Sequence, residues 1–430
     1  MIRRGFAAAR TALTRPASAR PLSIRALSAR TLLRGERAVL AALGLLLAAV
    51  VLANQWGVLT PDTKPEFFLA PWRSARDFAR PWLLSPELGS LNYNVGVAPV
   101  AALFGVLDSL GLPPWLIQRV WRIGLLLIAA WGARALYREL TAGSAADTAA
   151  GRVAAAVAYA ANPYVVVGGG TTPTLLPYAL LPAFVLALLR AVRLRSWRWA
   201  LLAALAMAGT SGINAGVVTL LQLIVVIPIA VHIAVTDRGS LPRLALALVQ
   251  AGTAYLLLSL YWLLPALGAL SRGSAVVSST ERLDSVNIGS SFAEVWRGLG
   301  MWTLYGSGPD GAFLPGQLAY LTAPLIVVLT FGGPILAALG ARLSTAPARV
   351  FAVGALLTGA LVMAAPFPFA HRSTWGDLVV GVLEGVPGAG AFRTLNKAGA
   401  VLEIGVALLA ALAVAALVPR LRAIRSGGWW

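Results

Sequence analysis

The sequence contains no cysteine and only two histidines among its 430 residues. Disulfide bonds and thiolate metal sites are therefore excluded. Charge is also scarce: only 12% of the residues are charged, whereas 58% are hydrophobic and the mean hydropathy is +0.78. This composition is too apolar for a soluble domain with a charged surface, so lipid is the main solvent of the chain.

Acidic residues are fewer than basic ones, with 16 against 35 arginines and lysines, and the formal net charge is +19. The basic residues are dispersed in short loops between apolar runs, which indicates membrane topology and no nucleic-acid partner. Residues 1–37 hold nine arginines and a single acid, Glu36. This segment is similar in composition to a transit peptide, but we interpret it as a disordered cytoplasmic tail or the product of a misassigned start codon.

A membrane-spanning helix needs about 20 predominantly apolar residues. About ten segments approach this criterion and predict an all-α polytopic membrane protein. They lie near 38–58, 117–137, 152–168, 173–190, 199–210, 213–234, 244–269, 318–340, 349–365 and 398–418. The segment 95–111 is apolar but short and contains Pro99 and Asp108, so we interpret it as interfacial or re-entrant.

With that interpretation, the arginine-rich loops and both termini fall on one side, which the positive-inside rule assigns to the cytoplasm of a bacterial plasma membrane. The transmembrane domain then covers 38–419 and precedes a basic cytoplasmic end at 420–430. Its three long external loops hold most of the acids and lie at 59–116, 270–317 and 366–397. No internal repeat is detectable in the sequence, so an inverted-repeat transporter has no support.

The first external loop begins with Thr60-Pro61-Asp62-Thr63-Lys64-Pro65-Glu66, directly after the first span. A carboxylate held at the membrane boundary can deprotonate an acceptor hydroxyl, which makes Asp62 a candidate general base. The alternative is that Asp62 only marks the end of the helix. Lys64 adds a cation in a segment that two prolines stiffen.

The second external loop contains Glu281 and Asp284. Either acid could join Asp62 in binding a hard divalent cation through oxygen ligands, and we take Asp62 with Glu281 as the candidate metal pair. The alternative is a solvated loop whose charges pair locally, for example with Arg282. Spacing in the sequence leaves both interpretations open.

The third external loop ends with Phe392-Arg393-Thr394-Leu395-Asn396-Lys397. If the last helix has begun by Arg393, its side chain and that of Lys397 share one face of the first turn. Two cations at a helix N-terminus favour a phosphate at the outer surface, and the alternative is snorkelling to lipid headgroups. Glu403 lies inside the last span and should face the protein interior. Asn214 is expected at an external hairpin, with a structural turn as the simpler interpretation.

Five short motifs occur in an order and spacing that characterise one family. They are Pro61-Asp62-Thr63-Lys64, Leu112-Pro113-Pro114-Trp115-Leu116-Ile117-Gln118-Arg119-Val120-Trp121, Ala158-Tyr159-Ala160-Ala161-Asn162-Pro163, Glu281 with Glu294-Val295-Trp296-Arg297-Gly298, and Ala391-Phe392-Arg393-Thr394-Leu395-Asn396-Lys397. In these motifs, residues 59–400 resemble the actinobacterial AftD-type α-(1→3)-arabinofuranosyltransferases.

The resemblance implies a GT-C fold with interfacial helices in the first external loop and an extracytoplasmic active site. It further implies a decaprenyl-phosphate-linked arabinofuranose donor and a cell-wall arabinan acceptor. Asp62 matches the acid that acts as base, Glu281 an acid of the second loop, and Arg393 with Lys397 the family's Phe-Arg-Asn…Lys motif. Thr394 and Asn396 depart from the usual Asn and His, so we expect a different polar lining.

These expectations lead to an inverting glycosyl transfer in which Asp62 acts as base and Arg393, Lys397 and Lys64 stabilise the departing lipid phosphate. A divalent cation could contribute, but no organic cofactor is implied, because the lipid carrier supplies the activated sugar. Family members continue into carbohydrate-binding modules, whereas this sequence ends at Trp430, which leaves a compact paralogue, a split gene or a truncated copy. The alternatives are a non-catalytic flippase or transporter of a lipid-linked glycan and a catalytically lapsed scaffold. The oligomeric state is not indicated.

Overall fold

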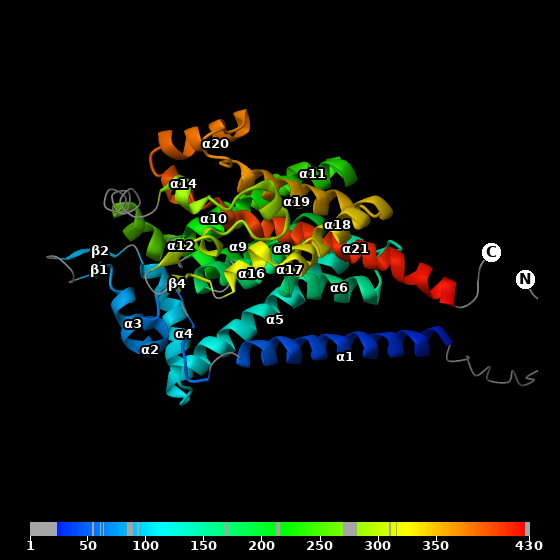
Figure 1. Ribbon diagram of the computed structural model, residues 1–430, viewed down its shortest axis with the longest axis horizontal. Helices are drawn as coiled ribbons and strands as arrows, with labels where there is room; N and C mark the ends of the chain where they lie inside the picture. Colours follow the sequence, from blue (N-terminus) through cyan, green and yellow to red (C-terminus); the bar gives the residue numbers. More distant parts are fainter. Residues whose placement is uncertain are drawn as a thin grey trace, which may run out of the picture.

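The structure is a computed structural model of the 430-residue chain. It describes residues 24–53, 56–60, 62, 64–83, 89–92, 94–167, 171–211, 216–269, 282–308, 311–314 and 316–425. These residues form a bundle of helices (Figure 1). Helix α1 begins at one extremity of the bundle, and helix α21 ends at the same extremity, which we call the terminal end. The opposite extremity, where α2, α3, α4, β1, β2, α14 and α20 gather, is the loop end.

Seven helical stretches in the described part of the chain are long and apolar enough to cross a membrane. They are formed by α1 (Ile24–Leu52), α5 (Pro114–Thr141), α8 (Thr172–Leu194), α10 (Val217–Gln222) continued by η3 (Leu223–Val225) and α11 (Val226–Thr236), η4 (Arg238–Ser240) with α12 (Leu241–Gly268), α17 (Pro324–Thr330) with α18 (Gly332–Leu343), and η7 (Leu395–Ala398) with α21 (Gly399–Arg425). The other three predicted spans correspond to shorter helices, α6 (Ala149–Ala160), α9 (Trp197–Ser211) and α19 (Ala348–Ala364). The all-α polytopic fold is confirmed.

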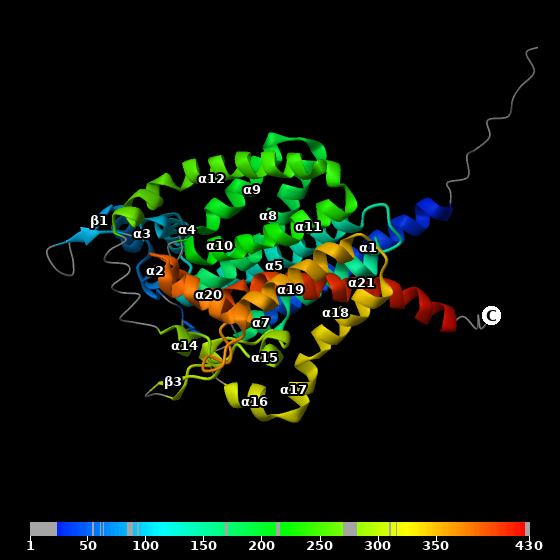
Figure 2. The same cartoon turned by 90° about the horizontal axis from the view of Figure 1, so that it is seen from above.

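Smaller elements connect these helices, most of them at or near the loop end (Figure 2). The helical ones are α2 (Glu66–Leu69), α3 (Pro71–Ala79), η1 (Val95–Val97), α4 (Ala98–Ser109), α7 (Pro163–Val167), α14 (Leu283–Val286), α15 (Phe292–Trp296), η5 (Trp302–Leu304), α16 (Gln317–Thr322), α20 (Thr374–Gly385) and η6 (Ala389–Phe392). Two antiparallel pairs of two-residue strands join β1 (Trp82–Leu83) to β2 (Ser90–Leu91) and β3 (Ser307–Gly308) to β4 (Gly311–Ala312).

Two predicted boundaries are wrong. The tail, expected to be disordered as far as residue 37, is helical from Ile24, because α1 extends back beyond its apolar core. The predicted span 152–168 is divided into α6 and α7, and the division falls at Asn162-Pro163. A proline disfavours the helical conformation of the residue before it, which explains the break.

The segment 95–111 contains η1 and the short helix α4. Helix α4 has 12 residues, which at 1.5 Å per residue is about 18 Å and well short of the roughly 30 Å of hydrocarbon. It packs against α2 and α3 through the stacked rings of Phe68 and Phe104, whose centroids lie 4.8 Å apart. The Trp72 indole N–H also donates to the Ser109 hydroxyl at 2.8 Å. The first loop therefore folds into a compact group of short helices at the loop end.

Helix α21 forms the centre of the bundle. Every residue from Ala398 to Ala413 is buried, and α18 and α19 pack closely along it. The approach depends on glycine: a Cβ on Gly340 would collide with the carbonyl of Leu409, and one on Gly359 would lie 2.5 Å from the backbone nitrogen of Leu402. Small residues allow helix backbones to approach in this way inside membranes.

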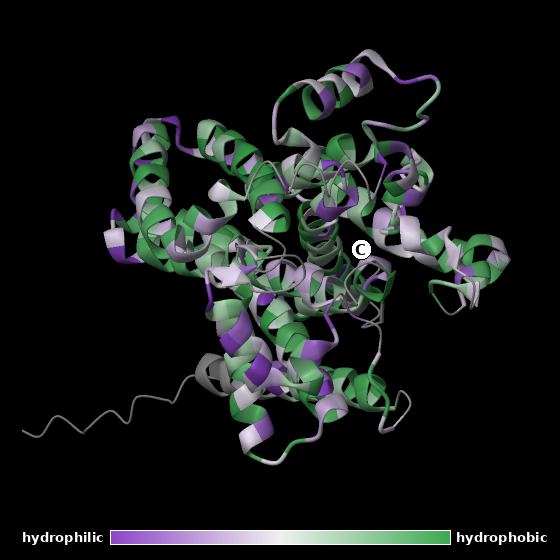
Figure 3. Ribbon diagram, turned by 90° about the vertical axis from the view of Figure 1, so that its left-hand side faces the viewer, coloured by the Kyte–Doolittle hydropathy of each residue, from purple (hydrophilic) through white to green (hydrophobic). Residues whose placement is uncertain are grey.

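The outer faces of the bundle are apolar. Figure 3, which views the molecule from the loop end, shows hydrophobic residues along most helices and hydrophilic ones concentrated in the connections. Large hydrophobic side chains are exposed on α12 and α17, including Leu246, Val249, Leu257, Leu264, Leu325 and Val328. A soluble protein rarely exposes apolar surface on this scale, so these faces suit contact with lipid chains.

At the terminal end, the single acid of the basic N-terminal segment is buried in an ion-pair network. Glu36 accepts hydrogen bonds from Arg134 and Arg152, and the latter guanidinium also pairs with Asp147 at 2.7 Å. The carboxylate side chain is only 1% exposed. This network joins α1 to α5 and α6.

Candidate functional site

Asp62 lies at the loop end, between α1 and α2, and is held by the first residue of α8. Its carboxylate accepts hydrogen bonds from the backbone nitrogen of Thr172 at 3.1 and 3.2 Å and from the hydroxyl of the same residue at 2.8 Å. The first N–H groups of a helix lack intrahelical acceptors, and the helix dipole is positive there, so this position favours an anion. The carboxylate is thus oriented by a residue 110 positions along the chain.

Gln118 of α5 fixes the chain just before Asp62. The Gln118 amide oxygen accepts from the Thr60 backbone nitrogen at 2.9 Å, and its amide nitrogen donates to the Thr60 carbonyl, also at 2.9 Å. Its neighbour Arg119 is buried and donates to the carbonyls of Val51 and Val58, at 2.8 and 3.1 Å. These contacts join the end of α1 to α5 and position the segment that carries Asp62.

Arg122 was not singled out from the sequence. It lies four residues after Gln118 and therefore on the same face of α5, where its guanidinium interacts with the charge of Asp62. A cation within the predicted span 117–137 is a signal that could have identified it, because charged groups inside membrane helices are costly and usually functional. The site thus pairs an acid with an arginine.

Lys64 lies two residues after Asp62, beside α2 and α3. Its ammonium lies 4.8 Å from the ring centroid of Phe78 and 5.8 Å from that of Phe67, a cation–π arrangement. Burial lowers the pKa of the Lys64 ammonium, and the nearby Glu66 carboxylate partly opposes this shift. Lys64 is therefore held among aromatic rings at one side of α3.

A hollow of about 480 Å³ opens between α3, α4 and α12. It is lined by Ala75, Ala79, Pro81, Val95, Ala98, Pro99, Ala102 and Tyr261. Its lining is mostly apolar, and neither Lys64 nor Phe78 is among the lining residues.

The acids of the second external loop are only partly described. Glu281 lies outside the described residues. Asp284 accepts hydrogen bonds from Arg282 at 2.9 and 3.2 Å, which hold the pKa of its carboxyl below the usual range. This is the local pairing that the sequence left open as the alternative to a metal ligand. Among the described residues, no group of three or more His, Asp or Glu side chains could hold a metal ion.

The prediction that Arg393 and Lys397 share one face of an α-helical turn is wrong. The α-helix begins only at Gly399, and the two cations lie around the short 3-10 segments η6 and η7. The carbonyl of Arg393 accepts from the Asn287 side chain at 2.8 Å and from the Leu395 backbone nitrogen at 3.1 Å. Because these donors occupy that carbonyl, it does not begin a regular helical ladder. Both cations are nevertheless partly exposed at the loop end.

Two predicted residues near this loop are buried. Asn396 is completely buried. Its side-chain amide nitrogen donates to the sulfur of Met301, and its backbone carbonyl accepts from the Tyr164 hydroxyl at 3.1 Å. Glu403 is 3% exposed and faces the interior, as predicted. It lies against Gly298 of the second external loop, where a Cβ would come within 2.6 Å of its Oε1 atom.

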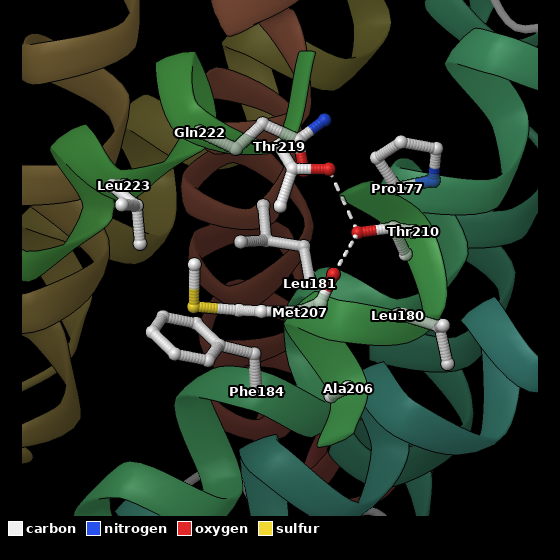
Figure 4. Close-up of a pocket in the computed structure, with 10 residues that line it drawn as sticks. All are labelled: Pro177, Leu180, Leu181, Phe184, Ala206, Met207, Thr210, Thr219, Gln222 and Leu223. Carbon is white, nitrogen blue, oxygen red and sulfur yellow. Dashed lines mark hydrogen bonds between the residues drawn. The ribbon is translucent and has the colours of Figure 1, made fainter. Parts of the chain in front are cut away.

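Asn214 lies outside the described residues, but the helices on both sides of it are described. The hydroxyls of Thr210 and Thr219 lie 2.7 Å apart, joining α9 to α10 beside a cavity of about 20 Å³ (Figure 4). Such a volume holds roughly one water molecule and is too small for a sugar. The polar groups that line this cavity therefore have a structural role in the helix hairpin.

Residues 46–427 match the family described as alpha-(1->3)-arabinofuranosyltransferase, N-terminal GT-C domain. The chain belongs to this family. A curated relative, the alpha-(1->3)-arabinofuranosyltransferase of Mycobacterium tuberculosis, is 30% identical over 155 residues, which are 34% of this chain and 11% of the relative. The family match thus covers most of the helices of the bundle.

Solved structures show the same GT-C fold. The cryo-EM structure of arabinofuranosyltransferase AftD from Mycobacteria matches with a TM-score of 0.57 at 23% identity, and a mutant R1389S structure of that protein matches with 0.57 at 22%. Each covers 91% of this chain but only 27% of the solved chain. The chain thus spans a small part of the length of the relatives that it matches.

Proposed function

We propose that this chain is a membrane glycosyltransferase domain that transfers arabinofuranose from a polyprenyl-phosphate donor to cell-wall arabinan, with inversion, on the extracytoplasmic face. The observation that carries the proposal is the Asp62 carboxylate, oriented by Thr172 and accompanied by Arg122 at the end of the bundle that also presents Arg393 and Lys397. Membership of the arabinofuranosyltransferase family supports the choice of sugar. The donor, the acceptor and the residue roles are parts of the proposal.

In the proposed reaction, an acceptor hydroxyl oxygen attacks the anomeric carbon of the donor sugar from the face opposite the phosphate. The bond between that carbon and the phosphate oxygen breaks, and the phosphate leaves with the bonding electrons. Asp62 takes the hydroxyl proton as the new glycosidic bond forms. The orientation of the carboxylate by Thr172 is what this step needs, because a misplaced base loses much of its effect.

The departing phosphate develops negative charge that preorganised cations can stabilise. Arg393 and Lys397 take this role in the proposal, with Lys64 as a third cation. The hollow between α3, α4 and α12 is mostly apolar and adjoins the lipid-facing helix α12, so we assign it to the polyprenyl chain. The proposal thus places an anionic head at the cations and a hydrocarbon tail in the hollow.

The steps above are assigned to side chains of this chain alone. Glu281, the second acid of the predicted metal pair, lies outside the described residues. Retention or loss of transfer activity on chelation with EDTA therefore tests whether a divalent cation on Asp62 and Glu281 takes part.

The test is transfer from radiolabelled decaprenyl-phosphoryl arabinofuranose in membranes. Asp62→Asn should abolish transfer and Arg393→Ala should reduce it by at least about tenfold, the size of one charge-assisted hydrogen bond. Asp284→Asn, which breaks only an exposed pair with Arg282, is the matched control and should retain activity. Full activity in both Asp62→Asn and Arg393→Ala would refute the mechanism. Movement of the labelled lipid across the membrane without sugar transfer would favour the alternative function, a flippase or transporter of a lipid-linked glycan.

A further inference from the structure

Three polar atoms behind Arg393 are buried without a partner. The side-chain oxygens of Asn287, Ser290 and Asn396 have no hydrogen-bond partner among the described residues, although these residues are 3%, 0% and 0% exposed. Buried polar atoms are almost always paired, because leaving one unpaired costs free energy comparable to a lost hydrogen bond. Three in one region indicate that something outside the chain pairs them.

The three residues belong to one closed circuit of contacts. The Asn287 amide donates to the Arg393 carbonyl at 2.8 Å, and the chain leads from there through three residues to Asn396, whose amide contacts Met301. Met301 follows Gly300, where a Cβ would lie 3.8 Å from the Gly289 carbonyl just before Ser290. The backbone nitrogen of Ser290 in turn donates to the Asn287 carbonyl at 3.0 Å. These contacts bring the three residues together in one region between the second and third external loops.

The chemistry of these atoms identifies the kind of ligand. The Asn287 amide nitrogen donates to two carbonyls, those of Arg393 and Leu283, so the unpaired atom must be the amide oxygen, which only accepts hydrogen bonds. The unpaired Asn396 atom is also an amide oxygen, whereas the Ser290 hydroxyl both donates and accepts. An ionised phosphate offers acceptors only and cannot pair the two amide oxygens. Sugar hydroxyls, which can donate, can pair with all three atoms.

We propose that Asn287, Ser290 and Asn396 form a subsite that binds the hydroxyls of the sugar carried by the lipid phosphate. This inference rests on the proposed function, which places the phosphate at Arg393. A sugar joined to that phosphate lies directly beside it, and the subsite lies directly behind the same residue. The three residues are 3%, 0% and 0% exposed, so binding of the sugar requires their side chains to become accessible.

The test compares two lipids that differ only in the sugar, decaprenyl-phosphoryl arabinofuranose and decaprenyl phosphate. Their dissociation constants are measured on the full chain in nanodiscs. The wild type should bind the sugar-bearing lipid more tightly. Ser290→Ala should weaken binding of that lipid by about three- to tenfold, the effect of one neutral hydrogen bond, and leave binding of the bare lipid unchanged. Because it removes an unpaired hydroxyl, it should not lower the thermal midpoint of the free protein.

A matched control is available in α12. Ser259 is also 0% exposed with an unpaired hydroxyl, but it lies in a membrane helix, and Ser259→Ala should change neither affinity. A second variant, Asn287→Asp, keeps an acceptor oxygen and loses the donor to the Arg393 carbonyl, so it should weaken binding of both lipids.

Equal affinity of the wild type for the two lipids would overturn the subsite alone and would mean that these atoms pair with water only. The same conclusion follows if Ser290→Ala weakens both lipids equally or neither. Failure of the wild type to bind either lipid would overturn the proposed function together with the subsite.

Discussion

Asp62 owes its orientation to residues far along the chain. Thr172 supplies both the backbone and the hydroxyl donors, and Gln118 fixes the preceding Thr60 from another helix. The motif around Asp62 predicted a carboxylate directly after the first span, and in the structure Asp62 lies between α1 and α2. The partners were not predictable, since a threonine at the start of a helix is most often only a cap or a turn residue.

Thr172→Val tests whether this orientation matters. The substitution keeps the shape of the side chain and removes the 2.8 Å hydrogen bond to Asp62. We expect the rate constant of transfer to fall by about tenfold or more, because hydrogen bonds to charged groups contribute about 1.5–3 kcal/mol. Thr174→Val, one half-turn along α8, removes a hydroxyl that contacts only Thr171 at 3.3 Å and serves as control. Equal rates in the two variants would show that Thr172 does not orient the base.

At the scale of elements, hydropathy located the helices but not their breaks. Each of the ten predicted spans falls on helix, because burying backbone in lipid requires helical hydrogen bonding whatever the neighbours are. The last predicted span, 398–418, agrees with α21, which begins at Gly399. Arg393 lies before this α-helix, and its carbonyl accepts from the Asn287 side chain, a contact over 106 residues that the sequence did not indicate.

The close packing of α21 against α18 should make stability sensitive to the size of the residue at 340. Gly340→Ala places a methyl group against the carbonyl of Leu409, which forces the two backbones apart. We expect the free energy of unfolding to fall by about 1–3 kcal/mol, the usual cost of overpacking.

Gly252→Ala is the control for this change. Nothing lies within 4 Å of a Cβ at Gly252 in α12, so alanine there should leave stability unchanged or raise it by about 0.5–1 kcal/mol. Thermal midpoints of the two purified variants in one detergent are the measurement. If the thermal midpoints of the two variants shift equally, the close contact between α18 and α21 does not require glycine at position 340.

For the whole molecule, the arrangement of charge predicts its orientation. The loop end should face outward and the arginine-rich terminal end the cytoplasm. The sequence has no cysteine, so single exposed cysteines can be introduced without a background. Ser285→Cys, at an exposed position in α14, should react in intact cells with a maleimide that does not cross the membrane, whereas Arg238→Cys between α11 and α12 should react only after the membrane is opened. The reverse pattern would place the proposed active site in the cytoplasm.

The sequence by itself determined the fold class and the residues that carry the family's motifs. These features follow from local properties, the hydropathy and charge of short segments, which do not depend on distant contacts. The tertiary structure alone decided that Thr172 and Arg122 accompany Asp62 and that Asn287 holds the loop of Arg393. These contacts join segments up to 110 residues apart, and only the packing of the helices around α21 brings such segments together.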